Sequence, residues 1–340
     1  RRVVRAAYRA GAGHVTVIWA DDQVTRLTYE NCDLSFFEHT PSWQVEQLNS
    51  LAEDGAAFLF LEGSDPSALK DVDPAKPAAW ASEVFPDLSP AEALYRLWVL
   101  VLEVSRADGD DPESSWETHN ASFEKTKRFL NSRHFDALRY ESDNGTDLTV
   151  GLPEGHVWDG GAGRTQDGVT FFPNIPTEEV FTSPDRLRAD GVVHSALPLV
   201  RSGQIVRNFW LRFEGGRVVD FGAEQGREVL RHIIETDEGA RRLGEVALVS
   251  KNTPIRQSET LFFSTLYDEN ASCHLALGMG FPECLEGGVN LDKEELLARG
   301  VNQSSTHVDF MIGTDDLNVF GISADGTETP VFVNGQWAWE

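Results

Sequence analysis

The triplet His307-Val308-Asp309 carries an imidazole and a carboxylate at a spacing that suits a shared metal ion. If the segment is a strand, alternation places His307 and Asp309 on one face, with the apolar residues beside them on the other. Both side chains can then reach the same cation. A hydrogen-bonded His–Asp pair in a protein core is at least as common an interpretation of this spacing.

Further acidic and histidine residues lie in apolar surroundings. Residues 268–274 hold Glu269 and His274 between apolar runs, Glu245 enters an apolar strand-like run, and Glu179 lies between a proline and an aromatic residue. Charged residues are seldom buried unless they are paired or bind a metal. For each residue alone, a solvent-exposed turn or strand end is the simpler interpretation. Taken together, they favour a metal site.

The donors in these segments are oxygen and nitrogen atoms. Cys273 precedes His274, so in an extended segment its thiol would point away from the imidazole. An oxygen and nitrogen donor set suits zinc, cobalt, manganese or magnesium. Several carboxylates with two histidines also fit a dinuclear site, because bridging carboxylates offset the charge of two close cations. The residues therefore favour a metal site that a dinuclear arrangement would fit, without fixing the identity of the metal.

The first half of the chain alternates helix and strand signals. Helical patterns occupy residues 1–10, 41–53, 89–106 and 113–133, and compact apolar runs at 14–19 and 56–61 have the character of buried strands. The third helix has a clear start, with Ser89 as the N-cap, Pro90 at its first position and Glu92 three residues after the cap. A loop rich in Pro and Asp is expected at 64–80. These patterns predict an α/β N-terminal domain over residues 1–145.

Beyond residue 145 the chain is rich in strand patterns, and glycines occur frequently between them. A hairpin turn is expected at Gly215-Gly216 and a helix over much of 222–241. Strands are expected at 147–151, 192–199, 205–213, 217–221, 246–249, 261–266, 308–311 and 319–322. This half is predicted to be an α+β, strand-rich, metal-binding domain over residues 146–340, with the domain boundary in the polar segment 141–145.

The acidic charge balance of the chain bears on which kinds of partner it can bind. Asp and Glu number 55 against 29 Lys and Arg, a formal net charge of −26. Nucleic acid and anionic membranes both require a basic surface, so neither is an expected partner. The longest apolar runs are too short to span a bilayer, and the three cysteines form neither a disulfide framework nor a zinc motif. The chain opens on Arg1 without a secretory signal, as if a preceding segment were removed, so a cytoplasmic location is expected.

Four strings that contain these residues resemble the thermophilic metallo-aminopeptidase family, of the aminopeptidase T and aminopeptidase S type. They are residues 174–183 (NIPTEEVFTS), 243–249 (LGEVALV), 268–278 (DENASCHLALG) and 307–313 (HVDFMIG). Residues 147–153 and 334–338 are also similar to family segments, and the N-terminal half is similar more loosely. Four ordered motifs at compatible spacing are a far more specific signal than a lone His-x-Asp.

The resemblance implies that Glu179, Glu245, His274, His307 and Asp309 bind two divalent cations, with Glu269 nearby as a ligand or an acid/base. It implies a homodimer that removes N-terminal amino acids from peptides with a free N-terminus. The family motif carries a tyrosine where this chain has Phe281, which cannot donate a hydrogen bond. That departure leaves a second hypothesis: the chain is a family member with impaired or lost activity that acts as a metal-binding protein.

The chemistry expected of such a site is hydrolysis by a metal-activated water. A carboxylate must take the proton of that water and pass it to the leaving amine, and the sequence offers Glu245 or Glu269 for this role. A different dinuclear hydrolase, acting on phosphoesters, would want Lys or Arg beside the metal ligands. Few basic residues lie near them in the sequence; Arg241, Arg242 and Lys251 are the nearest to Glu245.

Overall fold

A computed structural model describes residues 2–19, 24, 27–28, 31–33, 41–60, 79–165, 168–201 and 204–339 of the chain. The chain divides into two compact units, Arg1–Ser64 and Asp65–Glu340. The division into domains near residue 145 stays a prediction. Each unit is treated by itself below, and the second one holds the candidate site.

The first unit contains two of the predicted helices, α1 (Arg2–Arg9) and α4 (Ser42–Glu53). The two strands predicted beside them were wrong: residues 14–19 and 56–60 lie outside any strand, and Leu61 lies outside the described residues. Their side chains are exposed, with Trp19 at 83% and Phe60 at 84%. An apolar run becomes a strand only where a neighbouring strand pairs with it, and the run itself does not carry that information. The predicted loop at 64–80 lies almost entirely outside the described residues.

Three helices open the second unit: α5 (Ala79–Val84), α6 (Pro90–Val104) and α7 (Pro112–Arg133). The predicted helix start at Ser89 is confirmed, because Ser89 and Glu92 form a capping box. The buried faces of α5 and α6 share a hydrophobic cluster with Ile255 in α9 (Pro254–Gln257), Phe262 and Ala271. This cluster joins the helices to the segment that leads to His274.

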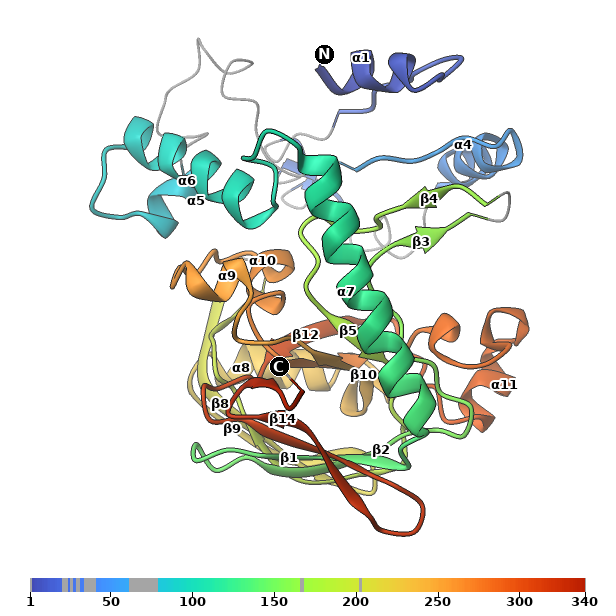
Figure 1. The fold of residues 1–340 in the computed structure, drawn as a ribbon, viewed down its shortest axis with the longest axis vertical. Helices are drawn as coiled ribbons and strands as arrows, with labels where there is room; N and C mark the ends of the chain where they lie inside the picture. The colour runs from blue at the N-terminus through green and yellow to red at the C-terminus, as the bar shows by residue number, and fades with distance from the viewer. Residues whose placement is uncertain are drawn as a thin grey trace. The chain divides into compact units, whose positions relative to one another are not determined.

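A large antiparallel sheet forms the base of the second unit (Figure 1). Its order is β15-β14-β13-β1-β2-β6-β8-β7, and β9 pairs with β8 beside this path. The turn between β8 and β9 lies at Gly215-Gly216, as predicted. The strands are β1 (Ala137–Glu141), β2 (Asp147–Gly151), β6 (Ala189–His194), β7 (Leu199–Arg201), β8 (Gln204–Glu214), β9 (Arg217–Gln225), β13 (Asn318–Ile322), β14 (Glu328–Val333) and β15 (Gln336–Trp337).

A second antiparallel sheet has the order β12-β11-β10-β5. Its strands are β5 (Val180–Thr182), β10 (Leu243–Leu248), β11 (His274–Gly278) and β12 (His307–Met311). One continuous hydrophobic core contains buried residues from both sheets and from α7 and α8 (Arg227–Ile234). A two-stranded ribbon, β3 (Gly163–Arg164) with β4 (Thr170–Phe171), and α11 (Lys293–Ala298) complete the regular elements that bear on the site.

Three sequence predictions in this unit need correction. The strand expected over 192–199 is not continuous, because β6 ends at His194 and β7 begins only at Leu199. Residues 261–266 are not a strand: the segment leads into α10 (Thr265–Glu269). The reason is Asp268, whose carboxylate accepts hydrogen bonds from the backbone N–H groups of Phe262 and Ser264 and so folds the segment into a turn. The helix expected over 222–241 is shorter, because β9 continues to Gln225 and α8 ends at Ile234.

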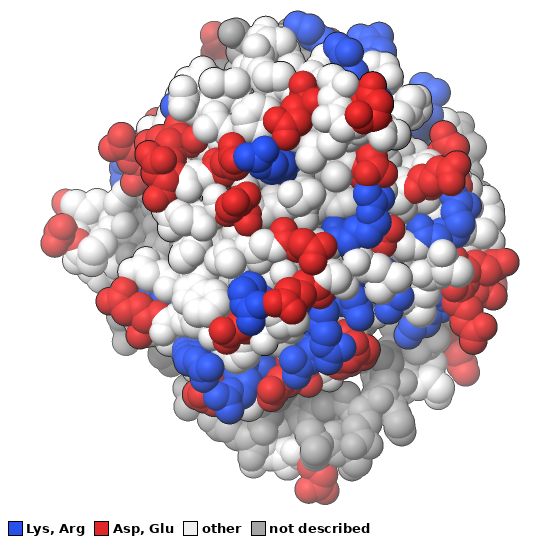
Figure 2. Space-filling view, turned by 90° about the horizontal axis from the view of Figure 1, so that it is seen from below, with Lys and Arg blue, Asp and Glu red and all other residues white. Residues whose placement is uncertain are grey.

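The fold class is confirmed as mixed α/β with a strand-rich C-terminal part. No helix among the described residues is long and apolar enough to cross a membrane. The face in Figure 2 carries basic and acidic side chains side by side. Ion pairs among the described residues include those of Arg139 with Glu141, Arg188 with Asp136, and Arg217 with Glu238.

Candidate functional site

The four-stranded sheet places the candidate ligands on one face. Cross-strand partners in an antiparallel sheet share a face, and Glu245 pairs with Ala276, which pairs with Asp309. His274 and His307 each lie two residues from a member of this row and therefore face the same way. The intervening residues, including Val246, Leu275, Val308 and Phe310, are buried in the core on the other face. The predicted alternation of His307 and Asp309 is confirmed.

A β-bulge in β10 aims Glu245 into the cluster. The register shifts between Leu243, which pairs with Leu277, and Glu245, which pairs with Ala276. The extra residue is Gly244, and a Cβ there would lie 2.3 Å from the carbonyl oxygen of Met279. Only glycine fits this close backbone approach, so the Leu-Gly-Glu order is what lets the carboxylate enter an apolar strand.

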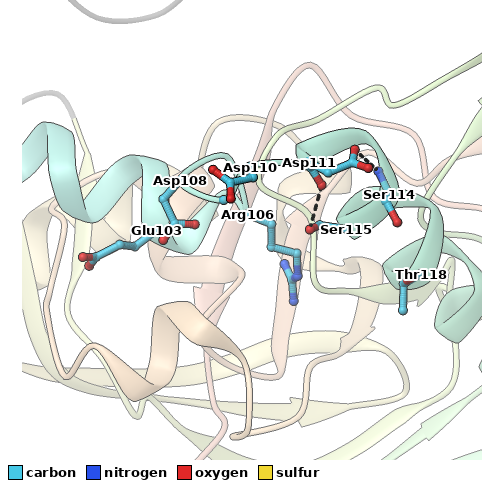
Figure 3. Close-up of a pocket in the computed structure, with 9 residues that line it drawn as sticks. Glu103, Arg106, Asp108, Asp110, Asp111, Ser114, Ser115 and Thr118 are labelled. Atoms are coloured by element: carbon cyan, nitrogen blue, oxygen red, sulfur yellow. Dashed lines mark hydrogen bonds between the residues drawn. The ribbon is translucent and has the colours of Figure 1, made fainter.

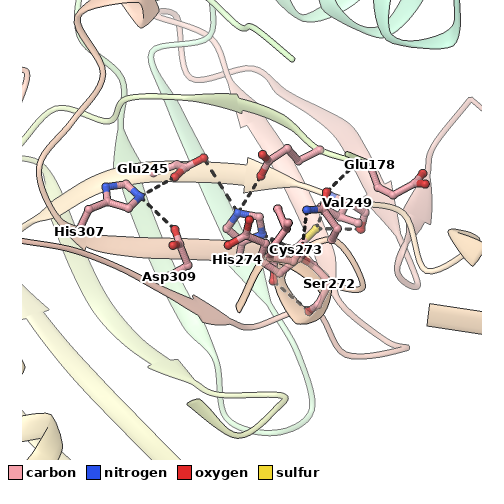
Figure 4. Close-up of polar contacts among 12 residues, drawn as sticks. Glu178, Glu245, Val249, Ser272, Cys273, His274, His307 and Asp309 are labelled. Carbon is pink, nitrogen blue, oxygen red and sulfur yellow. Dashed lines mark hydrogen bonds and ion pairs between the residues drawn. The ribbon is translucent and has the colours of Figure 1, made fainter. Parts of the chain in front are cut away.

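The side chains form one connected cluster (Figure 4). The Nε2 atom of His274 lies 2.9 Å from Glu179 and 4.0 Å from Glu245. The Nε2 atom of His307 lies 3.1 Å from Glu245 and 3.1 Å from Asp309. Glu245 therefore lies between the two imidazoles and contacts both.

Each histidine is oriented by backbone carbonyl groups. The Nδ1 atom of His307 lies 2.7 Å from the carbonyl oxygen of Met279, and that of His274 lies 3.1 Å and 3.0 Å from those of Glu269 and Ser272. A carbonyl oxygen only accepts, so Nδ1 carries a hydrogen in both rings and Nε2 faces the carboxylates. This is the orientation in which protein histidines bind metals.

Glu269 comes to the cluster from α10 rather than from the sheet. Its carboxylate lies within 4.8 Å of ligand atoms of His274 and Asp309. Among the described residues, no side chain or backbone group forms a hydrogen bond or ion pair with this carboxylate. Glu269 is thus the one member of the cluster whose carboxylate lies near the others without a hydrogen bond or ion pair to any described residue.

The pKa values of the cluster show how strongly its charges interact. Burial raises the pKa of Glu245 to about 7, against the lowering effect of its hydrogen bond to His307. Burial also raises the pKa of Glu269 well above its usual value, and the nearby Asp309 adds to this. Burial alone would lower the pKa of His307, but its hydrogen bonds to Asp309 and Glu245 outweigh that and raise it to about 11. The carboxylates therefore stabilise positive charge between the two imidazoles.

A pocket of about 400 Å³ opens over the cluster. Besides Glu179, Glu245, Glu269, His274, His307 and Asp309, it is lined by residues 159–163 and by Pro173, Asn174, Thr177, Phe181, Phe281 and Glu283. No lysine or arginine is among these lining residues. Asp159 is 3.3 Å from the Lys127 ammonium, whereas Glu283 has no hydrogen bond or ion pair to any described residue.

Phe281 forms part of the pocket wall. Its ring centroid lies 5.0 Å from that of His307 and 5.4 Å from that of Phe181. Its backbone N–H donates a hydrogen bond to the Ser183 hydroxyl at 2.7 Å, and this bond holds the backbone that carries the ring. Phe281, which stands where the family motif has a tyrosine, therefore faces the cluster.

All six sequence-predicted site residues, Glu179, Glu245, Glu269, His274, His307 and Asp309, come together in this pocket. Their roles as ligands or catalysts stay predictions. Sequence reasoning missed Asp159 and Glu283. Asp159 lies in a loop and Glu283 in a three-residue 3-10 helix, and neither segment has a periodic pattern or motif. Cys273 behaves as expected: its thiol is buried against Val249, away from the cluster, and burial raises its pKa to about 12.

Comparisons with known proteins show what the chain is similar to. A family model described as thermophilic metalloprotease (M29) matches residues 1–79 and 77–337. Aminopeptidase 2 of Geobacillus stearothermophilus is 42% identical over 372 residues, covering 100% of this chain and 90% of that protein. Aminopeptidase T of Thermus aquaticus is 41% identical over 369 residues, covering 99% and 90%. The solved structure of wild-type AmpT from Thermus thermophilus has a TM-score of 0.86 and 40% identity, covering 99% of this chain and 90% of that one.

Proposed function

Since the chain belongs to the thermophilic metalloprotease (M29) family, we propose that it is a metal-dependent aminopeptidase that removes N-terminal amino acids from peptides. The observation that carries this proposal is the cluster of four carboxylates and two histidines at the base of one pocket. The alternatives of an inactive metal-binding protein and of a phosphoester hydrolase are not favoured. The second of them would need basic residues beside the cluster, and none lines the pocket.

The donor set fits two divalent cations. Three groups of side chains offer ligand atoms that all lie within 4.8 Å of one another: Glu179, Glu245 and His274; Glu245, His307 and Asp309; and Glu269, His274 and Asp309. Glu245 belongs to the first two, as expected of a carboxylate shared between two ions. We assign Glu179, Glu245, His274, His307 and Asp309 as ligands. Bound there, the cations would polarise the scissile carbonyl and activate a water molecule.

Glu269 is the better candidate for the proton carrier. A general base must reach the reacting water and be free to exchange a proton. Glu245 is held by His307 at 3.1 Å and contacts His274, whereas the carboxylate of Glu269 has no partner among the described residues. Glu269 accepts the proton of the attacking water and returns it to the leaving amine.

The pocket also suits the free amino terminus of a peptide. With the cations bound, the charge of the cluster is offset, and Asp159 is already paired with Lys127. Glu283 then remains as an unpaired carboxylate on the pocket wall, placed to attract the ammonium group of the substrate. The homodimer that completes the proposal rests on the family resemblance, and a cytoplasmic location stays a prediction.

Removal of metal is the experiment that tests this function. We expect two divalent metal ions per chain by elemental analysis, and hydrolysis of aminoacyl-nitroanilides that stops in chelator and returns when zinc, cobalt or manganese is added back. An N-acetylated substrate serves as the control, because it lacks the ammonium group and should not be cleaved. Turnover that persists after chelation has removed the metal would contradict the proposal.

Phe281 is expected to limit the rate without abolishing it. The change Phe281→Tyr places a hydroxyl group on a ring that lines the pocket and should raise kcat by about 10-fold or more. A donor acting fully on the transition state is worth about 10²–10³-fold in rate. The measurement is kcat on leucyl-nitroanilide, with Phe171→Tyr on the exposed ribbon as the control. An unchanged or lower kcat in Phe281→Tyr would show that the pocket does not use a donor at this position.

A further inference from the structure

We propose that Arg106 is a positioning residue for the metal centre, acting through its ion pair with Glu178, the neighbour of the candidate ligand Glu179. The inference rests on the proposed function, since it concerns how strongly the same site holds its cations. Arg106 lies outside the pocket that holds the cluster and follows the C-terminus of α6.

Glu178 is a buried carboxylate that points away from the cluster (Figure 4). Its side chain is only 4% exposed, and both of its oxygens accept hydrogen bonds from the Arg106 guanidinium, one of them at 3.0 Å. A bidentate pair of this kind fixes direction as well as distance. Glu179 is the next residue along the chain and faces the opposite way, with its carboxylate 2.9 Å from His274. Holding Glu178 therefore fixes the direction in which Glu179 points.

The backbone before Glu179 is held at two more points. The Nε2 atom of His119, on α7, lies 2.9 Å from the carbonyl oxygen of Thr177. The backbone N–H of Glu178 donates to the Asn270 side chain at 2.6 Å, and Asn270 follows Glu269 in the chain. The segment 177–179 is thus clamped by α6, α7 and the end of α10. The Nε2 atom of His119 also lies 3.6 Å from the Glu178 carboxylate, but burial lowers the pKa of that imidazole, so the permanent positive charge opposite Glu178 is that of Arg106.

The conformation of Arg106 is informative in its own right. Its φ angle is 53°, in the left-handed region, at the position after a helix C-cap where glycine is usual. A non-glycine residue in this conformation is uncommon and is a reason to look for a side-chain role. Figure 3 shows the guanidinium extending away from Asp110 and Asp111 of its own loop. Its partner is the distant Glu178 rather than the acidic residues beside it.

The consequence of losing this contact follows from the surrounding charge. Glu178 would remain buried with only the His119 imidazole, 3.6 Å away, beside its carboxylate, next to a cluster that already holds four carboxylates. A buried charge that has lost its bidentate partner is strongly unfavourable and would lower the stability of the fold. Independently of that charge, segment 177–179 would lose the two-point contact that fixes its direction. Glu179 would move with it, and the cations would lose a well-placed ligand.

The test is the metal affinity of the full chain, measured by titrating metal-depleted protein with Co²⁺ and following its visible absorption. Arg106→Gly removes the side chain and relieves the positive φ angle. We expect it to weaken Co²⁺ binding by about 10–100-fold, the usual effect of removing a group that orients a metal ligand. Arg106→Lys keeps the charge but loses the two-point contact, so a smaller loss is expected. KM should change little, because neither residue lines the pocket.

Two comparisons separate positioning from general stability. In the double variant Arg106→Gly/Glu178→Gln the buried charge is gone, so the unfolding temperature should recover while Co²⁺ affinity stays low. The matched control is Arg256→Lys, because Arg256 is similarly exposed, at 25% against 21% for Arg106, and also pairs with an aspartate or glutamate. Wild-type affinity in Arg106→Gly, or recovery of affinity together with stability in the double variant, would overturn the proposal. Either result would leave chelator-sensitive hydrolysis by the wild-type chain intact, and with it the proposed function.

Discussion

The variant Glu245→Gln is expected to lower kcat/KM for aminoacyl-nitroanilides by about 10³-fold or more, a loss of about 4 kcal/mol of transition-state stabilisation. Glu245 lies between the two histidines, and an amide of the same shape offers a single neutral oxygen in place of a charged pair. The bound metal should fall with the activity. Elemental analysis of the purified variant, beside its turnover, gives the measurement, and His307→Ala should behave in the same way.

Unfolding is not the expected cause of that loss. Burial raises the pKa of Glu245 from 4.5 to about 7. In the metal-free protein, ionisation of this buried carboxyl group therefore lowers the free energy of unfolding progressively as pH rises from 4.5 to 7. A neutral glutamine removes that cost, and the unfolding temperature of the metal-free variant at neutral pH should not fall. The control is Glu214→Gln, which changes a carboxylate that is 63% exposed. Full metal content and full turnover in Glu245→Gln would remove Glu245 from the ligand set.

The variant Glu269→Gln is expected to lower kcat by about 10²–10⁴-fold, the range over which a positioned acid or base contributes. Its carboxylate is near His274 and Asp309 but engages no described partner, so it is free to carry a proton. Unlike Glu245→Gln, this variant should keep its metal, because all five assigned ligands remain. The measurement is kcat with elemental analysis on the same preparation.

The contrast between the two glutamine variants decides the assignment of the base. Metal loss in Glu269→Gln would make Glu269 a ligand, and metal retention with a large loss of kcat in Glu245→Gln would move the base to Glu245. An unchanged kcat in Glu269→Gln would exclude it from proton transfer. The sequence left these two residues as alternatives, and only their contacts separate them.

Local patterns predicted those features that depend on neighbours in the chain. The start of α6 at Ser89 and the shared face of His307 and Asp309 follow from capping chemistry and from strand alternation, and both are confirmed. The same kind of reasoning failed at residues 261–266. There the side chain of Asp268 captures backbone N–H groups and outweighs the apolar pattern.

Features that depend on distant segments were not predictable from patterns. The apolar runs at 14–19 and 56–60 have strand composition, but the described part of the first unit gives them no strand partner. The bulge at Gly244 requires glycine because the backbone at Met279 approaches it. Arg106 and Glu178 are 72 residues apart, and no local signal links them.

The sequence by itself determined which side chains can bind a cation and, through four ordered motifs, the family. Residue type and short spacing are sufficient for both. The tertiary structure decided which of those side chains meet, because antiparallel pairing of β5, β10, β11 and β12 brings segments more than 100 residues apart onto one face. It also supplies the contacts on which the proposed division of labour between Glu245 and Glu269 rests. That division depends on which carboxylate has partners within hydrogen-bonding distance, and such distances are set only when the chain has folded.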